Sequence, residues 1–424
     1  MSLNSTPSSE RIHIGFFGRT NAGKSSLINA ITEQRVSLVS EIRGTTTDPV
    51  KKSMELLPLG PVVLIDTPGL DDKSKLGEKR EQRTWEILKQ IHIAVIVADV
   101  LEGITEVETQ LEQKLKQNQI PYIVVYNKID ILKKEEEKSR AGFENKEDIH
   151  CYEKEKKNKT TDNSLGNLIK KDIVYVSTVT GENINLLKEK LAAIELNKQE
   201  RKLVSDLLEP KDHVVLVIPI DKAAPKGRLI LPQQQTIRDI LDAGCTLSVC
   251  QVENVKATLE LLQRPPKLVI TDSQVFGKVK EAVPRDILLT SFSILFARYK
   301  GDLERTVEGA RRIEELKDGD KILIAEGCTH HKQCGDIGTE KLPKWISDYS
   351  GKKLKFEFSS GGEFTEELSE YKLIIHCGAC MLNEKQMQSR ITLAKEAGVS
   401  MTNYGIVIAY LNGILERSIE PFQV

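Results

Sequence analysis

The sequence predicts an α/β protein of three domains, and two observations support this fold class. Short apolar runs typical of β-strands alternate with segments typical of helices, which is the rhythm of parallel sheets. The motifs that carry chemistry follow directly after such runs, where open α/β sheets place their sites. At 424 residues the chain has room for about three domains. We expect them at 10–197, 206–291 and 292–424, the first with a mostly parallel sheet and the others with small α/β sheets.

The composition gives no sign of a nucleic-acid or membrane surface. The 61 basic and 62 acidic residues leave a formal net charge of −1, so no basic field is expected. The first ten residues lack the apolar core of a signal peptide, and apolar runs such as Ile406–Leu411 are too short to cross a bilayer. The seven cysteines then indicate thiols rather than disulfides. We expect a soluble, cytoplasmic protein that binds neither nucleic acid nor membrane.

A phosphate-binding loop follows the first strand-like run, Ile12–Phe17. Residues 18–25 read Gly-Arg-Thr-Asn-Ala-Gly-Lys-Ser, the G-x-x-x-x-G-K-S pattern, and an apolar helical segment begins at Ser26. The glycines let backbone N–H groups turn towards phosphate oxygens, Lys24 reaches the β- and γ-phosphates, and the Ser25 hydroxyl is a Mg²⁺ ligand. Alone, this loop indicates only a nucleoside triphosphate.

Three further motifs indicate that the nucleotide is GTP or GDP. One strand-like run ends in Asp-Thr-Pro-Gly, where Asp66 should hold Mg²⁺ through water and the Gly69 N–H should meet the γ-phosphate. A second ends in Asn-Lys-Ile-Asp, whose Asp130 carboxylate can accept the two N–H donors that guanine offers and adenine does not. A third is followed by Ser-Thr, whose backbone can touch the guanine ring. The expected nucleotide-binding residues are Asn21, Ala22, Gly23, Lys24, Ser25, Ser26, Asn127, Lys128, Asp130, Ser177 and Thr178.

The loop between the first two motifs reads Gly-Thr-Thr-Thr-Asp and is suited to be a switch loop, with Thr46 as the expected Mg²⁺ ligand. These residues resemble the TrmE/Era branch of GTPases, whose loop reads G-T-T-x-D. The resemblance implies that Asn21 marks a K⁺ site beside the phosphates. Leu70 follows Gly69, so the glutamine that orients water in Ras-like enzymes is absent. We therefore expect slow, K⁺-stimulated hydrolysis in which Lys24, Thr46, Asp66 and Gly69 take part.

Two regions lack a chemical motif. The segment from about 132 to 171 is a highly charged insertion that cannot bury a core, and we assign it no function. The middle domain has no phosphate loop, paired acids or metal spacing, and its Cys245 and Cys250 are expected to be core residues. A domain without chemistry but with a sheet edge to cover is a candidate for dimerisation, so we expect a homodimer.

Soft metal ligands follow two strand-like runs of the C-terminal domain, Lys321–Ala325 and Leu373–Ile375. A ligand set of three cysteines and one histidine suits a [4Fe–4S] cluster and a structural Zn²⁺ alike. Ligands at the ends of parallel strands, rather than on zinc-knuckle turns, favour the iron–sulfur cluster. Cys334 is a spare thiol that could substitute. The candidate ligands are Cys328, His330, His376, Cys377 and Cys380.

Over nearly its whole length the chain resembles the HydF family of [FeFe]-hydrogenase maturation GTPases, in which a TrmE-like domain, a dimerisation domain and a Cys-x-His…His-Cys-x-x-Cys domain follow one another. The resemblance implies a [4Fe–4S] cluster on Cys328, Cys377 and Cys380, with His330 and His376 matching the motif. It also implies a scaffold that receives a transient diiron subcluster, built with the radical-SAM maturases HydE and HydG, and delivers it to apo-[FeFe]-hydrogenase. The alternative is a GTPase acting on RNA or ribosomes with a structural zinc site. The near-neutral charge and the lack of a KH, OB or basic-aromatic stretch argue against it.

Overall fold

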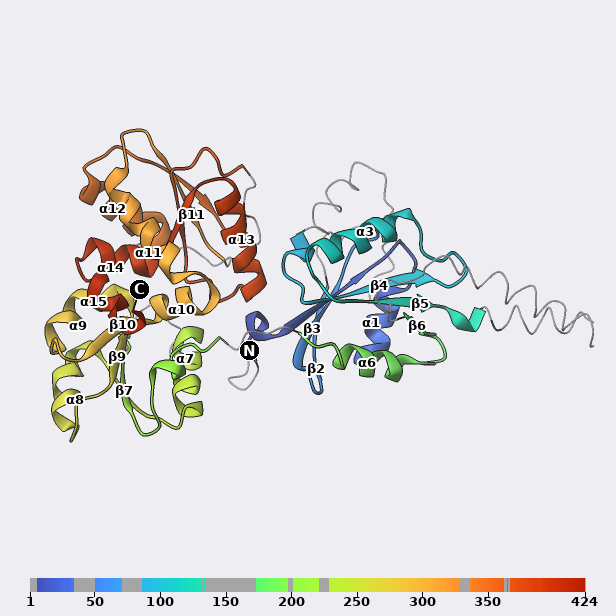
Figure 1. Cartoon of the computed structure of the whole chain (residues 1–424), viewed down its shortest axis with the longest axis horizontal. Coiled ribbons are helices and arrows are strands. Elements are labelled where there is room, and N and C mark those ends of the chain that lie inside the picture. Colours follow the sequence, from blue (N-terminus) through green and yellow to red (C-terminus); the bar gives the residue numbers. More distant parts are fainter. Residues whose placement is uncertain are drawn as a thin grey trace, which may run out of the picture. The chain divides into compact units, whose positions relative to one another are not determined.

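The structure is a computed structural model, and it describes residues 6–33, 50–70, 86–131, 133, 173–196, 201–220, 229–327, 336–361, 364 and 367–423. The chain divides into two compact units, residues 1–197 and 198–424, which are described separately (Figure 1). The described residues form one sheet of six strands in the first unit and two sheets of four strands in the second. The predicted α/β class with three sheets is therefore confirmed. No helix in these residues is long and apolar enough to span a bilayer.

The sheet of the first unit has the strand order β2-β3-β1-β4-β5-β6, in which only the β2–β3 pair is antiparallel. The central strands are buried on both faces, which explains their continuous apolar sequence. The strands are β1 (Ile12–Phe17), β2 (Lys51–Leu56), β3 (Gly60–Asp66), β4 (Ile93–Asp99), β5 (Tyr122–Asn127) and β6 (Ile173–Tyr175). The helices are α1 (Lys24–Thr32), α3 (Glu106–Gln117) and α6 (Ile184–Ala192).

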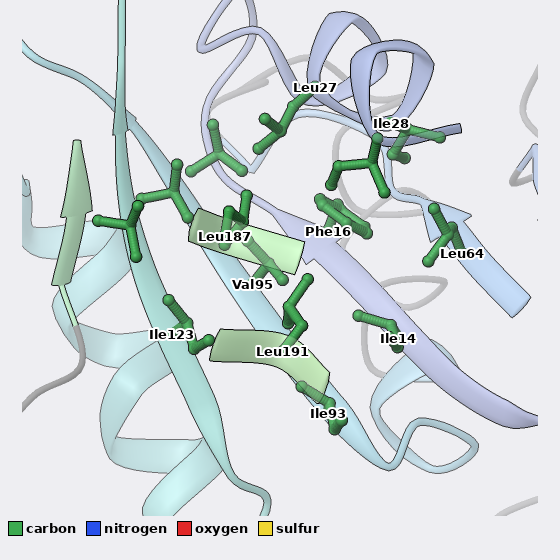
Figure 2. Packing of buried hydrophobic residues seen from close by; sticks show 14 of the residues in the cluster. Ile14, Phe16, Leu27, Ile28, Leu64, Ile93, Val95, Ile123, Leu187 and Leu191 are labelled. Carbon is green, nitrogen blue, oxygen red and sulfur yellow. The ribbon is translucent and has the colours of Figure 1, made fainter. Parts of the chain in front are cut away.

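Helices α1 and α6 cover one face of this sheet. Figure 2 shows Leu27 of α1 and Leu187 and Leu191 of α6 beside Phe16 and Val95 of the central strands. All five side chains are fully buried. This packing fixes the start of α1 directly after β1, so the loop between them is held at the carboxyl edge of the sheet.

The second unit contains two parallel sheets, β10-β9-β7-β8 and β12-β11-β13-β14. The strands are β7 (His213–Val217), β8 (Thr246–Cys250), β9 (Leu268–Thr271), β10 (Leu288–Ser291), β11 (Lys321–Ala325), β12 (Lys355–Ser359), β13 (Leu373–His376) and β14 (Ser400–Asn403). The α-helices are α7 (Leu231–Asp242), α8 (Val255–Leu261), α9 (Phe276–Ala282), α10 (Phe292–Lys300), α11 (Leu303–Arg311), α12 (Leu342–Ser350), α13 (Glu384–Glu396), α14 (Tyr404–Leu411) and α15 (Leu415–Ile419). The short helical turns of this unit are η2 (Ser205–Leu207), η3 (Val252–Asn254), η4 (Ser273–Val275), η5 (Arg312–Glu315), η6 (Ile337–Lys341) and η7 (Glu420–Phe422), and the first unit contains η1 (Ser8–Glu10).

Helix α14 joins the two small sheets into one body. Its Ile406 and Ala409 pack in the core that contains β7, β9 and β10, while Val407 and Ile408 pack in the core of β11 and β13. A helix that is apolar on all sides must be buried on all sides. The two sheets therefore share a helical layer and form a single compact unit (Figure 1).

The amphipathic sequence pattern of Phe292–Leu316 predicts one long helix, and this prediction is wrong. The chain forms α10 and α11, which are separated at Gly301 and Asp302. Asp302 caps α11 by accepting a hydrogen bond from the Arg305 N–H at 3.2 Å. A glycine followed by an N-cap aspartate is a stop and a start signal that the apolar periodicity concealed. The break turns α11 along strand β14.

We predict that Gly309→Ala destabilises the protein by about 1–3 kcal/mol, because overpacking a close contact forces the backbone to shift. A Cβ at Gly309 of α11 would lie 2.3 Å from the Met401 carbonyl oxygen of β14. Gly277→Ala in α9 is the matched control, since no atom lies within 4 Å of a Cβ there. Urea unfolding should show the control unchanged or stabilised by about 0.5–1 kcal/mol. Equal stabilities of the two variants would contradict the packing.

Candidate nucleotide and metal sites

The phosphate loop depends on two glycines with positive φ, Gly18 at 148° and Gly23 at 94°. A Cβ at Gly23 would lie 2.2 Å from Nδ2 of Asn127, and a Cβ at Gly18 would lie 2.1 Å from the Val97 carbonyl oxygen. Glycine is therefore required at both positions by conformation and by space. The loop is pressed against the ends of β4 and β5.

Asn127 connects the phosphate loop to the two segments that are predicted to recognise guanine. Its side chain is 1% exposed, and Nδ2 donates to the Ala22 carbonyl oxygen at 3.2 Å. Its Oδ1 accepts from the backbone N–H groups of Lys128 at 2.8 Å and Thr178 at 3.3 Å. One buried amide thus brings together three of the sequence motifs predicted for nucleotide binding.

The Asp130 carboxylate is oriented by Ser177. The Ser177 hydroxyl donates to Asp130 Oδ1 at 2.6 Å and accepts from the backbone N–H groups of Val179 and Thr180 at 3.2 and 3.1 Å. On the other side of the motif, Lys128 Nζ donates to Asp99 at 2.7 Å. The carboxylate is therefore fixed in advance, as selective guanine recognition requires.

Lys24, Ser25 and Asp66 meet at the phosphate end. Lys24 Nζ donates to the carbonyl oxygens of Gly18 at 2.9 Å and Arg19 at 2.8 Å, and the Ser25 hydroxyl donates to Asp66. The second oxygen of Asp66 is buried without a hydrogen-bond partner in the described residues. Burial raises the pKa of this carboxyl group, although the Ser25 hydrogen bond opposes the shift. A hydroxyl beside a desolvated carboxylate suits Mg²⁺, which prefers oxygen ligands.

Other predicted residues of the nucleotide site are only partly placed. The Asp-Thr-Pro-Gly stretch is anchored to β1 because the Thr67 hydroxyl donates to the Phe16 carbonyl oxygen at 2.6 Å. Gly69 follows this anchor. Asn21 is exposed with a φ of 63°. Ser26 is exposed on the first turn of α1. Thr46 and most of the charged insertion lie outside the described residues.

The thiol motifs follow two adjacent strands of the last sheet. Strands β11 and β13 pair in parallel, with Ala325 opposite His376. The Cys377 N–H continues this ladder by donating to the Ala325 carbonyl oxygen at 2.8 Å. The Gly327 N–H in turn donates to Cys377 Sγ at 3.1 Å. Cys328, the other predicted thiol ligand, is the next residue in the sequence after Gly327. It is therefore adjacent in sequence to a backbone N–H that contacts Cys377.

Cys377 and Cys380 lie on one tight turn whose Ala379 has a φ of 52°. Burial raises the pKa of both thiols. The Gly327 N–H partly offsets the shift at Cys377, and the Lys300 ammonium partly offsets it at Cys380. A metal centre would supply the positive charge that keeps such thiols deprotonated. The donor set therefore fits a thiolate-bound metal. No cluster of three metal-ligating side chains occurs within the described residues; Cys328, His330 and Cys334 lie outside them.

His376 is placed behind the turn with both ring nitrogens engaged. It is 0% exposed; Nδ1 donates to the Cys377 carbonyl oxygen at 2.9 Å, and Nε2 accepts from Arg390 at 2.7 Å. Arg390 also donates to the Gly361 carbonyl oxygen at 2.6 Å. Burial, together with the nearby Arg390 charge, lowers the pKa of His376 to about 3. In this arrangement the imidazole is neutral and supports the backbone of Cys377.

Sequence reasoning missed Lys300 and Arg390, both of which contact the thiol turn or its supporting histidine. A cavity of about 310 Å³ also adjoins the turn; its lining includes Phe296, Lys300, Gly309, Cys377, Ala379 and Met401. The sequence held one sign that Lys300 is buried, because this lysine ends a mostly apolar helical segment. Its partner could not be read from the sequence, because the contacted carbonyl groups lie about eighty residues further along the chain.

Three known protein families match successive segments of the chain. Residues 13–128 match the family described as 50S ribosome-binding GTPase. Residues 203–301 match the hydrogen maturase F dimerization domain, and residues 304–421 match the hydrogen maturase F tetramerization domain. The chain belongs to the HydF family. This HydF-family chain therefore carries a P-loop GTPase domain followed by two domains described as self-association domains.

Individual relatives each match only part of the chain. GTPase Der of Mycoplasmopsis pulmonis is 30% identical over 215 residues, which cover 49% of this chain and 46% of the relative. The tRNA modification GTPase MnmE of Chromobacterium violaceum is 36% identical over 124 residues, which cover 29% of this chain and 27% of the relative. The HydF-family chain thus spans less than half the length of these curated relatives. A crystal structure of Aquifex aeolicus Era with GDP and AlF₄⁻ matches with a TM-score of 0.30 and 19% identity, covering 56% of this chain and 92% of Era.

We predict that Asp130→Asn weakens GTP binding about 100-fold, or about 2.8 kcal/mol, because a charged acceptor of two hydrogen bonds is lost. The same variant should gain affinity for xanthosine triphosphate, whose 2-oxo group can accept from the new amide. Fluorescence titration with both labelled nucleotides measures the exchange. Asp348→Asn, at an exposed position of α12, is the control. Unchanged GTP affinity in Asp130→Asn would remove Asp130 from the guanine site.

Proposed function

We propose that this HydF-family chain is a GTP-hydrolysing scaffold that matures [FeFe]-hydrogenase. The observation that carries the proposal is the order of three family matches on one chain, with the Cys-x-x-Cys turn inside the last of them. Its cargo is a transient diiron subcluster, which is built with the radical-SAM maturases HydE and HydG and delivered to apo-[FeFe]-hydrogenase. The site of action is the cytoplasm.

In the nucleotide half of this proposal, Lys24 and the backbone from Asn21 to Ser26 bind the phosphates of GTP. Ser25, Asp66 and Thr46 hold Mg²⁺. The Gly69 N–H contacts the γ-phosphate, so the position of the residues after Gly69 depends on whether GTP is bound. Asn21 holds a K⁺ ion that compensates for the missing glutamine after Gly69. The desolvated Asp66 carboxylate beside Ser25 supports the Mg²⁺ assignment.

In the cluster half, Cys328, Cys377 and Cys380 hold a [4Fe–4S] cluster, which supplies an iron with an exchangeable fourth ligand. The Gly327 N–H stabilises the Cys377 thiolate, as its contact with Sγ supports. His330 remains a candidate for the fourth ligand. His376 was a candidate as well, but its two engaged nitrogens favour a role in holding the Cys377 carbonyl group.

Self-association completes the proposal, with a homodimer as the minimal unit. Strand β8 lies at the edge of its sheet and exposes Val249, and the nearby helices α7 and α8 expose Leu241 and Leu261. These apolar side chains lie in the segment that matches the dimerization domain. A second copy of the sheet edge is the partner that this surface fits.

The alternative function, a GTPase acting on RNA or ribosomes with a structural zinc site, rests on the description of the first family match and on relatives such as MnmE. It leaves the two hydrogen maturase matches unexplained. The metal bound by the thiols of the last sheet distinguishes the two functions, because a zinc site and an iron–sulfur cluster differ in colour and magnetic behaviour.

We predict that anaerobically reconstituted protein is brown and gives a [4Fe–4S]⁺ EPR signal after dithionite reduction. Cys377→Ser should lose or reshape this signal, because an alkoxide is a poorer ligand for iron than a thiolate. Cys250→Ser, a half-buried thiol of β8 in the other small sheet, is the control and should keep it. A colourless protein with one equivalent of zinc would instead support the RNA-GTPase alternative.

We also predict that GTP hydrolysis is faster in KCl than in NaCl by about tenfold or more, corresponding to about 1.4 kcal/mol of transition-state stabilisation. Asn21→Ala should remove the difference between the salts, since it removes the side chain that holds K⁺. Asn118→Ala, exposed at the end of α3, should retain it. Equal rates of the parent protein in both salts would end the role assigned to Asn21.

A further inference from the structure

Lys300 is a buried cation directed at the Cys-x-x-Cys turn. It is the last residue of α10 and is 2% exposed. Burying an ammonium group is costly unless its donors are satisfied. Its Nζ lies 2.9 Å from the Leu382 carbonyl oxygen and 3.5 Å from those of Ala379 and Cys380. All three acceptors belong to the turn that carries the two thiols.

The conformation of that turn needs external support. Ala379 has a φ of 52°, a left-handed conformation that is unfavourable for a non-glycine residue. Such residues persist where their surroundings hold them. The Leu382 N–H donates back to the Ala379 carbonyl oxygen at 3.1 Å, and Lys300 draws the same carbonyl group inward. With its carbonyl groups turned towards Lys300, the turn is held in one conformation between Cys377 and Cys380.

Lys300 is itself held in place from two sides. Gln388 of α13 donates to its carbonyl oxygen at 3.1 Å, and its ammonium lies 5.6 Å from the centre of the Phe296 ring. The charge therefore has a defined position beside the turn. A fixed, desolvated positive charge acts strongly on a nearby redox centre, because the local dielectric constant is low.

We propose that Lys300 is a positioning residue for the cluster turn and that its charge raises the reduction potential of the cluster bound there. This inference rests on the proposed function for the presence of the cluster. It adds that helix α10, which lies in the segment matching the dimerization domain, sets the shape and the potential of a site in the neighbouring domain.

The experiment compares Lys300→Met, Lys300→Gln and Lys300→Arg with the parent protein. Methionine removes donors and charge, glutamine keeps donors without the charge, and arginine keeps both. Lys395→Met on α13 is the matched control, because it removes an exposed lysine that lines the same cavity. The readouts are the midpoint potential by EPR-monitored redox titration and hydrogen exchange of the amides in residues 378–382.

The Met and Gln variants should both lower the midpoint potential by at least about 59 mV, equivalent to a tenfold change in the one-electron reduction equilibrium. Lys300→Arg should restore the parent value, and Lys395→Met should leave it unchanged. Exchange in 378–382 should accelerate most in Lys300→Met and less in Lys300→Gln. A parent-like potential in the Gln variant, or equal shifts in the Arg and Met variants, would overturn the charge role.

The two proposals fail in different ways. If the parent protein binds no iron–sulfur cluster, the proposed function fails, while hydrogen exchange of the metal-free variants still tests the positioning role. If the parent binds the cluster but exchange in 378–382 is the same in Lys300→Met and Lys395→Met, the positioning role of Lys300 fails alone. If Lys300→Met does not fold, the Gln and Arg variants decide both roles.

Discussion

The parallel register of neighbouring strands is the constraint on which both sites depend. Strands that pair in parallel end at the same edge, so groups distant in sequence meet there. The Asn127 amide reaches the Ala22 carbonyl group across 105 positions, and the Gly327 N–H reaches the Cys377 sulfur across 50. A slip of one residue between β11 and β13 would separate Gly327 from Cys377 and turn alternate side chains to the wrong face.

Each edge is completed by polar groups that are buried rather than exposed. In the first unit Asn127 supplies the donors and acceptors, and in the second His376, Arg390 and Lys300 do so. Burial of these groups is unfavourable unless their hydrogen-bonding capacity is met, and here it is directed at backbone atoms of the functional loops. The same interactions that satisfy these side chains therefore restrict the loops. A rigid loop loses less conformational entropy when a nucleotide or a cluster binds.

Much of the fold and of the nucleotide site could be predicted because the signals are local. The short apolar run Leu268–Thr271 forms strand β9, and Asp130 and Ser177, which belong to two separate sequence motifs, are joined by a hydrogen bond. The division of Phe292–Leu316 into α10 and α11 was missed, since apolar periodicity outweighed the Gly301-Asp302 signal. The surroundings of His376 and Lys300 were also missed. Their partners are set by how helices α10 and α13 pack on the last sheet, and no sequence pattern records that packing.

The placement of α10 bears on how the proposed scaffold would work. Its apolar face packs in the cores beneath the first small sheet, through Ile294 and Leu295, while its last residue holds the thiol turn of the second. Interiors of native density transmit small displacements instead of absorbing them. A partner bound to the exposed edge of the first small sheet could therefore alter the turn without touching it, provided that α10 moves as a rigid element. Coupling of this kind needs no contact with the thiols.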